Sequence, residues 1–192
     1  DGSSDGSGEV AQHLARSDPR VVALAHDRNR GKGAAVRTAI AHATGDVCIV
    51  QDADLEYDPA DFPRLLAPFT QDQADAVLGS RWSGSSNRVH HFWHRLLNRA
   101  FSTLASVVYN RALTDLHTCY KVVRREWLQA LDLRSTRFTF DPELMAKLSR
   151  LHARMVEVPI SYQGRDYWEG KKIGLRDAVA AVWAILWYGW GT

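Results

Sequence analysis

Residues 47–54 read Val-Cys-Ile-Val-Gln-Asp-Ala-Asp. The apolar, β-branched start of this stretch predicts a buried strand, and Asp52 and Asp54 follow where the backbone leaves it. Ligands of open α/β sheets bind at the carboxyl ends of the strands. Two carboxylates there suit a divalent cation, since Mg²⁺ commonly combines one or two carboxylates with substrate phosphates. The stretch therefore indicates either a metal-assisted phosphate site or a solvated acidic loop, and its neighbours decide between them.

The composition is that of one folded domain. Of the 192 residues, 45% are hydrophobic and 24% are charged, which suffices for a sizeable core. The formal net charge is only +2, so a nucleic acid is not indicated as a partner. Cys48 and Cys119 lie in apolar, strand-like runs without metal-ligand spacing, and we interpret them as reduced core residues of a cytosolic protein.

Strand-like and helix-like segments alternate in the first half of the chain, which predicts parallel strands covered by helices. A short helix with Ser7 as its N-cap is expected first, ending near Arg16. The strands that we expect next are 21–26, 46–51 and 74–78. The expected helices are 33–43 and 59–69, the second with Asp58 as its cap.

The second half continues the same pattern without a repeat or a linker. We expect a helix over 90–110, a strand over 119–123, helices over 126–131 and 141–151, a strand over 155–160 and a helix over 175–190. Residues 1–174 are therefore predicted to form one domain, followed by a terminal helical segment over 175–192.

Basic residues are placed around the predicted acidic loop. Arg81 directly follows an expected strand, so it should emerge at the same edge of the sheet as Asp52 and Asp54. A later loop carries Arg165, Lys171 and Lys172. Each basic residue alone is an ordinary surface charge. Together they would neutralise the charge that develops on a departing, metal-bound phosphate, which favours a nucleotide site.

Six short motifs occur in order along the chain. They lie at residues 1–7 (Asp-Gly-Ser-Ser-Asp-Gly-Ser), 29–35 (Asn-Arg-Gly-Lys-Gly-Ala-Ala), 52–54 (Asp-Ala-Asp), 79–81 (Gly-Ser-Arg), 115–121 (Asp-Leu-His-Thr-Cys-Tyr-Lys) and 158–172, from Val-Pro-Ile to Lys-Lys. In this order the chain resembles the family 2 inverting glycosyltransferases of the GT-A fold, and among them the dolichyl- or polyprenyl-phosphate mannose and glucose synthases. The resemblance implies an α/β, Rossmann-like fold whose mostly parallel sheet carries helices on both faces.

The resemblance also implies roles for individual residues. Those that would contact the nucleotide sugar are Asp1, Lys32, Asp52, Ala53, Asp54, Arg81, Arg165, Lys171 and Lys172. Those that would hold Mg²⁺ or Mn²⁺ are Asp52, Asp54 and Glu56, with Asp54 as the main ligand and Glu56 where relatives often have Gln. Thr118 and Arg81 would bind the acceptor phosphate, and the catalytic candidates are Arg81, Arg165 and Asp115. Thr114 stands where some relatives carry an Arg, so one of their phosphate contacts is not expected here.

The reaction that the resemblance implies is transfer of a hexose from GDP-mannose or UDP-glucose to a polyprenyl or dolichyl phosphate, with inversion. A lipid phosphate is already ionised at neutral pH, so it needs no strong general base, and the protein would mainly orient the reactants and stabilise charge. Two alternatives stay open. One is a GT-A transferase with a polysaccharide or protein hydroxyl as acceptor and Asp115 as general base, and the other is an inactive remnant or binding module.

The family normally begins with a strand and a helix that hold the base and ribose, and neither precedes Asp1 in this sequence. We therefore expect an N-terminally truncated GT-A fold with an exposed sheet edge and weak or no activity on its own.

Two apolar helical segments suggest a membrane surface. The expected helix over 90–110 carries aromatic, aliphatic and basic residues, which fits either core packing or an interfacial helix. Residues 178–190 contain no charge and end in a cluster of Trp and Tyr, but this run is shorter than the ~20 residues that span a bilayer. We expect an anchor lying on the cytoplasmic face of a membrane, with a buried terminal helix as the alternative.

Overall fold

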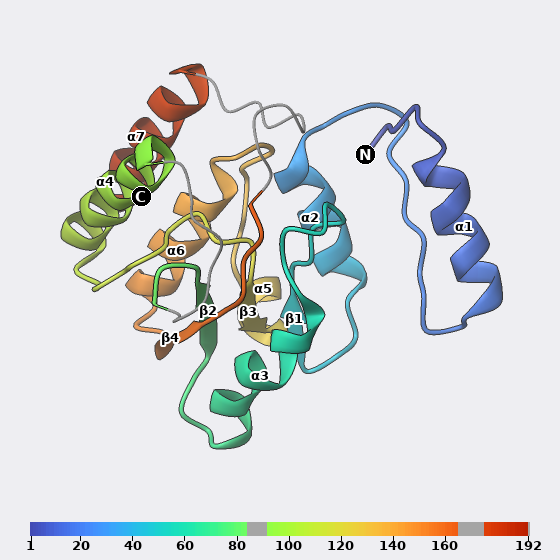
Figure 1. Ribbon diagram of the computed structural model, residues 1–192, viewed down its shortest axis with the longest axis horizontal. Coiled ribbons are helices and arrows are strands. Elements are labelled where there is room, and N and C mark those ends of the chain that lie inside the picture. Colours follow the sequence, from blue (N-terminus) through green and yellow to red (C-terminus); the bar gives the residue numbers. More distant parts are fainter. Residues whose placement is uncertain (84–91, 165–174, 192) are drawn as a thin grey trace.

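The computed structural model describes residues 1–83, 92–164 and 175–191. Its centre is a four-stranded sheet in the order β1-β3-β2-β4 (Figure 1). The strands are β1 (Val47–Ile49), β2 (Ala76–Ser80), β3 (Lys121–Arg124) and β4 (Met155–Pro159). All four overlap segments expected from the sequence, with β2 and β3 each ending one or two residues later than expected, and the fold is the predicted α/β class.

The sheet is mixed rather than mostly parallel. β2 pairs in parallel with β4, whereas β3 runs antiparallel to both β1 and β2. Val122 and Val123 on β3 are both almost fully buried, so this strand is apolar on both faces. A central strand is apolar on both faces whether it runs parallel or antiparallel to its neighbours, so the sequence did not reveal that β3 is antiparallel.

The strand expected over 21–26 is wrong. Residues 21–26 have no sheet partner in the described part of the chain, and Val22 is 68% exposed. A β-branched run forms a strand only where a neighbouring strand makes hydrogen bonds with its backbone. In the described sheet β1 is the edge strand, so residues 21–26 do not extend the sheet beyond it. His26 is anchored through ring contacts to Asp1 and Thr38, and Val21 N donates a hydrogen bond to the nearby Asp18 O at 3.0 Å.

Helices cover both faces of the sheet, as expected. On one face lie η1 (Pro59–Asp61) and α3 (Phe62–Thr70), whose Leu65 packs with Val77 and Val122. The predicted cap is present, since the Asp58 carboxylate accepts a hydrogen bond from Ala60 N. On the other face lie α2 (Lys32–His42), α5 (Arg125–Ala130) and α6 (Phe140–Arg150).

Two long helices form an outer layer against α6. They are α4 (Phe92–Tyr109) and α7 (Leu175–Trp190), which lie side by side in Figure 1. Their inward residues include Ala105, Ala184 and Ile185, all fully buried. None of the described helices is long and apolar enough to cross a bilayer. The division of the chain at residue 174 stays a prediction.

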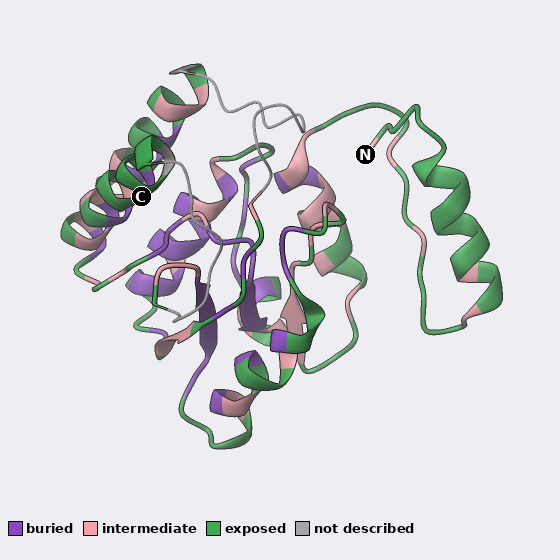
Figure 2. Ribbon diagram, viewed as in Figure 1, coloured by how far each residue is buried: buried purple, intermediate pink, exposed green. Residues whose placement is uncertain are grey.

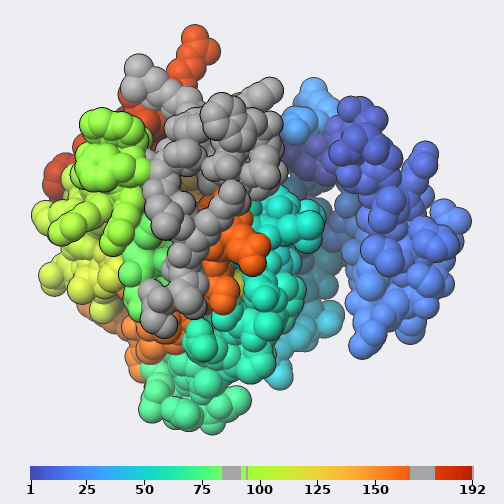
Figure 3. All heavy atoms as spheres, viewed as in Figure 1, coloured from blue at the N-terminus to red at the C-terminus, as the bar shows by residue number. Residues whose placement is uncertain are grey.

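The first helix, α1 (Ser7–Ser17), lies apart from this core and buries no residue (Figure 2). In the space-filling view the segment before α2 forms a lobe at one side of the molecule (Figure 3). Ser7 is the first helical residue and not the N-cap, which is Gly6 with φ of 87°. Asp5 performs the expected capping contact instead, since its carboxylate accepts hydrogen bonds from both Ser7 N and Ser7 Oγ.

Candidate active site

Two of the predicted site residues, Asp52 and Arg81, lie at one edge of the sheet. Because β1 and β2 are both antiparallel to β3, they run in the same direction and end at the same edge. Asp52 follows β1 there, and Arg81 follows β2 directly. β4 is parallel to β2, so Tyr162 reaches this edge as well. This common edge confirms the placement that the strand pattern predicted for Asp52 and Arg81.

Lys32 pairs with the acidic loop from the first residue of α2. Its Nζ lies 2.7 Å from Asp52 Oδ2 and 3.9 Å from Cys119 Sγ. Burial alone would lower the pKa of Lys32, but Cys119, Asp141 and Asp52 outweigh burial and raise it. Burial raises the pKa of Cys119 to about 12, so its thiol is neutral at pH 7 and the two carboxylates supply the effective counter-charge.

The residues on either side of Lys32 are glycines because a side chain at either position would clash with a neighbouring backbone. Gly31 has φ of 93°, and a Cβ there would collide with the Thr136 carbonyl oxygen. A Cβ on Gly33 would lie 2.6 Å from the Ser135 carbonyl oxygen. The start of α2 therefore rests directly on the backbone of 135–136, and only residues without a side chain permit this approach.

A partly buried charge cluster that sequence reasoning missed interacts electrostatically with Lys32. Asp141 at the start of α6 is 2.8 Å from Lys121 Nζ and 3.8 Å from His117 Nδ1. Burial would raise the pKa of Asp141, yet Lys121, His117 and Lys32 lower it below its usual range. The signal in the sequence was Lys121, a charged residue at the start of an apolar strand, because a buried lysine requires a counter-charge.

The acidic loop is held by its own backbone and by the segment that follows β4. Asp54 Oδ1 accepts a hydrogen bond from Glu56 N at 3.2 Å, and the exposed Ala53 lies between the two aspartates. The buried Glu56 accepts a hydrogen bond from Tyr162 Oη at 2.8 Å. Within residues 1–83, 92–164 and 175–191, no three acidic, His or Cys residues gather closely enough to hold a metal ion. The structure thus does not join Asp52, Asp54 and Glu56 into one three-carboxylate cage.

Arg81 and Asp115 form a bidentate pair. Arg81 Nε donates to Asp115 Oδ2 and Arg81 Nη2 donates to Asp115 Oδ1, each at 2.7 Å. The Arg81 backbone N–H adds a third hydrogen bond, to Asp115 Oδ2, at 3.1 Å. The Asp115 side chain is fully buried and that of Arg81 is 12% exposed. Burial would lower the pKa of Arg81, but Asp115 outweighs burial and raises it. The guanidinium also stacks 4.9 Å above the Tyr162 ring.

Two other predicted residues, Thr118 and Asp1, take different places, as does Thr114, which stands where some relatives carry an Arg. Thr118 is buried, and its hydroxyl finds no hydrogen-bond partner among the described residues. Asp1 accepts hydrogen bonds from Arg30 N and Gly31 N, so it ties down the chain just before Lys32. Thr114 donates its backbone N–H to Glu157, and its hydroxyl contacts Ser80 Oγ at 2.6 Å. Arg165, Lys171 and Lys172 lie outside the described residues.

Residues 1–132 match the family described as "Glycosyl transferase family 2". The chain belongs to glycosyl transferase family 2.

Among curated members of this family, undecaprenyl-phosphate mannosyltransferase from Micrococcus luteus is 31% identical over 183 residues, covering 91% of this chain and 74% of that protein. Undecaprenyl-phosphate 4-deoxy-4-formamido-L-arabinose transferase from Proteus mirabilis is 28% identical over 172 residues, covering 89% of this chain and 50% of that protein. The chain thus spans about half the length of several curated relatives that it matches.

Solved structures show the same fold. Glucosyl-3-phosphoglycerate synthase from Mycobacterium tuberculosis, in complex with Mn²⁺ and UDP-glucose, superposes with a TM-score of 0.68 at 18% identity, covering 99% of this chain and 66% of that one. This family 2 chain therefore has the GT-A fold that its motifs implied.

Proposed function

We propose that this family 2 protein transfers a hexose from a nucleotide diphosphate sugar, GDP-mannose or UDP-glucose, to a polyprenyl or dolichyl phosphate with inversion. The observation that carries the proposal is the pairing of Lys32 with Asp52 and of Arg81 with Asp115 at one sheet edge. This arrangement offers an acidic loop for a cation and cations for phosphates within one site. The names of the two undecaprenyl-phosphate transferases support the acceptor class.

On the donor side, Asp52, Ala53 and Asp54 would contact the nucleotide sugar, with Lys32 beside the diphosphate. Asp1 would act by holding the Lys32 segment, as its bonds to Arg30 N and Gly31 N favour. Arg165, Lys171 and Lys172 remain proposed diphosphate contacts.

The donor set fits Mg²⁺ or Mn²⁺. Asp52 already accepts a cationic partner, and Asp54 lies two residues away on the same loop. Mg²⁺ takes one or two carboxylates and completes its shell with water and phosphate oxygens, so a cage of three protein carboxylates is not required. Glu56 is the weaker candidate because its carboxylate holds Tyr162. A bound cation would offset the negative charge of the diphosphate.

On the acceptor side, an oxygen of the lipid phosphate would attack the anomeric carbon directly, while the bond to the nucleoside diphosphate breaks on the opposite face and that diphosphate leaves. The chain's own contribution is to orient that phosphate through Arg81 and Thr118 and to exclude water. The Thr118 hydroxyl is buried and has no hydrogen-bond partner in the described part of the chain, which suits this role because a ligand oxygen would satisfy it.

The alternative with a hydroxyl acceptor needs a general base, for which Asp115 was the candidate. Both Asp115 oxygens accept hydrogen bonds from Arg81, and the side chain is fully buried. This arrangement favours Asp115 as an anchor for Arg81 over a proton acceptor. The inactive binding module is the second alternative, and the transfer assay addresses it.

The test is transfer of radiolabelled sugar from GDP-mannose and UDP-glucose to a polyprenyl phosphate, using the full-length protein. Product should form with Mg²⁺ or Mn²⁺ and disappear with EDTA. Absence of product from both donors would contradict the proposal, and transfer to a polysaccharide instead would favour the alternative acceptor.

We also propose that the face formed by α4 and α7 rests on the cytoplasmic surface of a membrane. α7 both packs inward and carries exposed aromatic residues, since Ala184 and Ile185 are buried whereas Trp183, Trp187 and Trp190 are 56%, 50% and 75% exposed. Trp183 and Trp187 stack at 5.3 Å. Neighbouring α4 exposes Phe92 and Trp93, each 68%. Tryptophan favours the interface between lipid and water.

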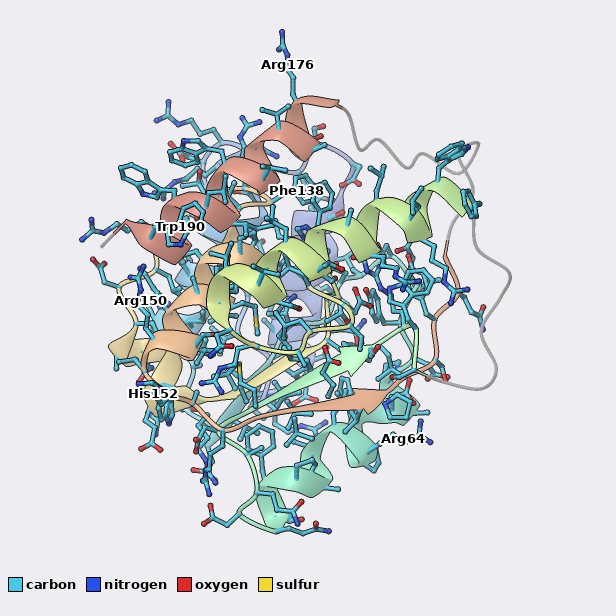
Figure 4. The ribbon with its side chains drawn as sticks, turned by 90° about the vertical axis from the view of Figure 1, so that its left-hand side faces the viewer. Arg64, Phe138, Arg150, His152, Arg176 and Trp190 are labelled. Carbon is cyan, nitrogen blue, oxygen red and sulfur yellow. The ribbon has the colours of Figure 1, made fainter. Side chains whose placement is uncertain are left out.

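Figure 4 looks onto this face and shows Arg176 projecting outward from the first turn of α7, with Trp190 near the other end. Arg150 also lies on this side and donates to the Tyr188 carbonyl oxygen. Basic groups at the rim of an aromatic face would add attraction to anionic lipids.

A Trp183→Gln/Trp187→Gln variant should bind anionic vesicles at least tenfold more weakly in sedimentation. Fully burying one large apolar side chain is worth about 1.5–3 kcal/mol, so losing two such contacts exceeds the ~1.4 kcal/mol that a tenfold change represents. Substitution is cleaner than removing α7, whose inward face covers α4 and α6. The matched control is Val10→Gln/Leu14→Gln on the distant α1, where the two side chains are 61% and 51% exposed. Equal loss of binding in both variants would reject the α7 face.

A further inference from the structure

We infer that Glu143 is a positioning residue of the donor site, which it controls through the backbone of residues 134–136 and the Gly-Lys-Gly start of α2. The inference rests on the proposed function, because it concerns how Lys32 is held for a nucleotide donor. Glu143 does not itself reach Lys32 or Asp52.

Glu143 is a fully buried carboxylate on α6 that holds a loop. Its two oxygens accept hydrogen bonds from Arg134 N at 2.8 Å and Ser135 N at 2.7 Å. Lys147, one turn later on α6, donates to the same carboxylate at 2.7 Å. Burial would raise the pKa of Glu143, but these three partners outweigh it and keep the pKa below its usual value. The side chain is therefore a charged clamp on residues 134–135.

The clamped loop is in turn the surface on which α2 begins. Thr136 O accepts a hydrogen bond from Ala34 N at 3.2 Å. The missing side chains of Gly31 and Gly33 are what allows the two backbones to touch. The loop cannot move toward α2 without a clash, and it cannot move away without losing this hydrogen bond.

The start of α2 carries Lys32, whose ammonium lies 2.7 Å from Asp52. A sequence of direct contacts thus leads from the centre of α6 to the acidic loop. The loop is also fixed from the outer layer, since Ser135 Oγ lies 3.2 Å from Tyr188 Oη on α7. Loosening the Glu143 clamp should let Lys32 drift from Asp52, and precise positioning of this kind is worth 10- to 100-fold in affinity at comparable supporting residues.

The experiment uses the full chain and two variants, Glu143→Gln and Lys32→Met, singly and combined. The measured quantity is the dissociation constant of UDP and of GDP with Mn²⁺, obtained by calorimetry. Glu143→Gln should weaken the tighter-binding nucleotide at least tenfold. Because the effect passes through Lys32, it should largely vanish in the Lys32→Met background, as a double-mutant cycle detects.

The matched control is Asp132→Asn, which removes one negative charge beside the same loop. Asp132 pairs with Arg134 at the surface, where both side chains are more than 70% exposed, and it should leave nucleotide affinity unchanged. If Glu143→Gln proves too unstable to purify, Gly33→Ala opens the same contact from the α2 side and should show the same dependence on Lys32.

Three results would overturn the inference: nucleotide binding by Glu143→Gln equal to that of the wild type, equal losses with and without Lys32, or no nucleotide binding by the wild type. Failure of the proposed function looks different. A wild type that binds the nucleotide but transfers no sugar to polyprenyl phosphate would reject that function while the double-mutant cycle still decides the role of Glu143.

Discussion

An Arg81→Met variant should lose about 3–5 kcal/mol of folding stability together with its transfer activity. The reason is Asp115, whose carboxylate is fully buried and has both oxygens bonded to Arg81. Removing the guanidinium leaves a buried carboxylate without its counter-charge, and such a group costs far more than a lost surface ion pair. Urea unfolding followed by circular dichroism measures the loss in free energy of unfolding.

A second variant separates the two losses. In Arg81→Met/Asp115→Leu both charges are gone, so most of the lost stability should return, because apolar replacements of buried ion pairs are often neutral or stabilising. Transfer activity should stay absent, since no cation remains to orient the phosphate. If the double variant is as unstable as the single one, the pair is not the source of the loss. If it transfers sugar, Arg81 is not part of the site.

The location of Arg81 could be predicted from the sequence, but its partner could not. That it follows a strand is a local pattern, and the strand ends fix the edge of the sheet at which it emerges. The pairing with Asp115 joins residues 34 positions apart, on segments whose approach depends on α4 packing against the core. The same holds for Lys121 and Asp141, where the buried lysine indicated that a counter-charge exists without saying which one.

For the glycines around Lys32, too, the sequence predicts the location but not the contacts that explain it. Resemblance to the family identified the Gly-Lys-Gly segment, yet the reason why glycine is needed on both sides of Lys32 lies about 100 residues later. A side chain at either glycine would clash with the carbonyl oxygen of Ser135 or Thr136. The strand errors have a similar origin. Residues 21–26 have the composition of a strand but no pairing partner in the described ranges 1–83, 92–164 and 175–191, and the direction of β3 depends on how the chain returns to the sheet. The pattern of apolar residues indicates burial and the helical or strand periodicity of a segment, whereas tertiary contacts decide which strands pair and in which direction.

The second large effect is expected at Asp54. An Asp54→Ala variant should lose metal-dependent donor binding, with transfer activity falling by a factor on the order of 10²–10³, the usual loss when a charge-stabilising group is removed from an active site. Calorimetry with the donor nucleotide and Mn²⁺, repeated with EDTA, measures the metal-dependent part directly. Unchanged affinity would remove Asp54 from the site.

Loop shape and charge must be distinguished at this position, because Asp54 Oδ1 also accepts a hydrogen bond from Glu56 N. Asp54→Asn retains an oxygen for that bond and loses only the charge, so it should fail in donor binding as Asp54→Ala does while unfolding like the wild type. Asp58→Asn is the matched control, since Asp58 lies four residues later, is exposed, and caps η1 through Ala60 N. An Asp54→Asn variant that binds donor normally would mean that Asp54 shapes the loop and that Asp52, already facing Lys32, holds the cation.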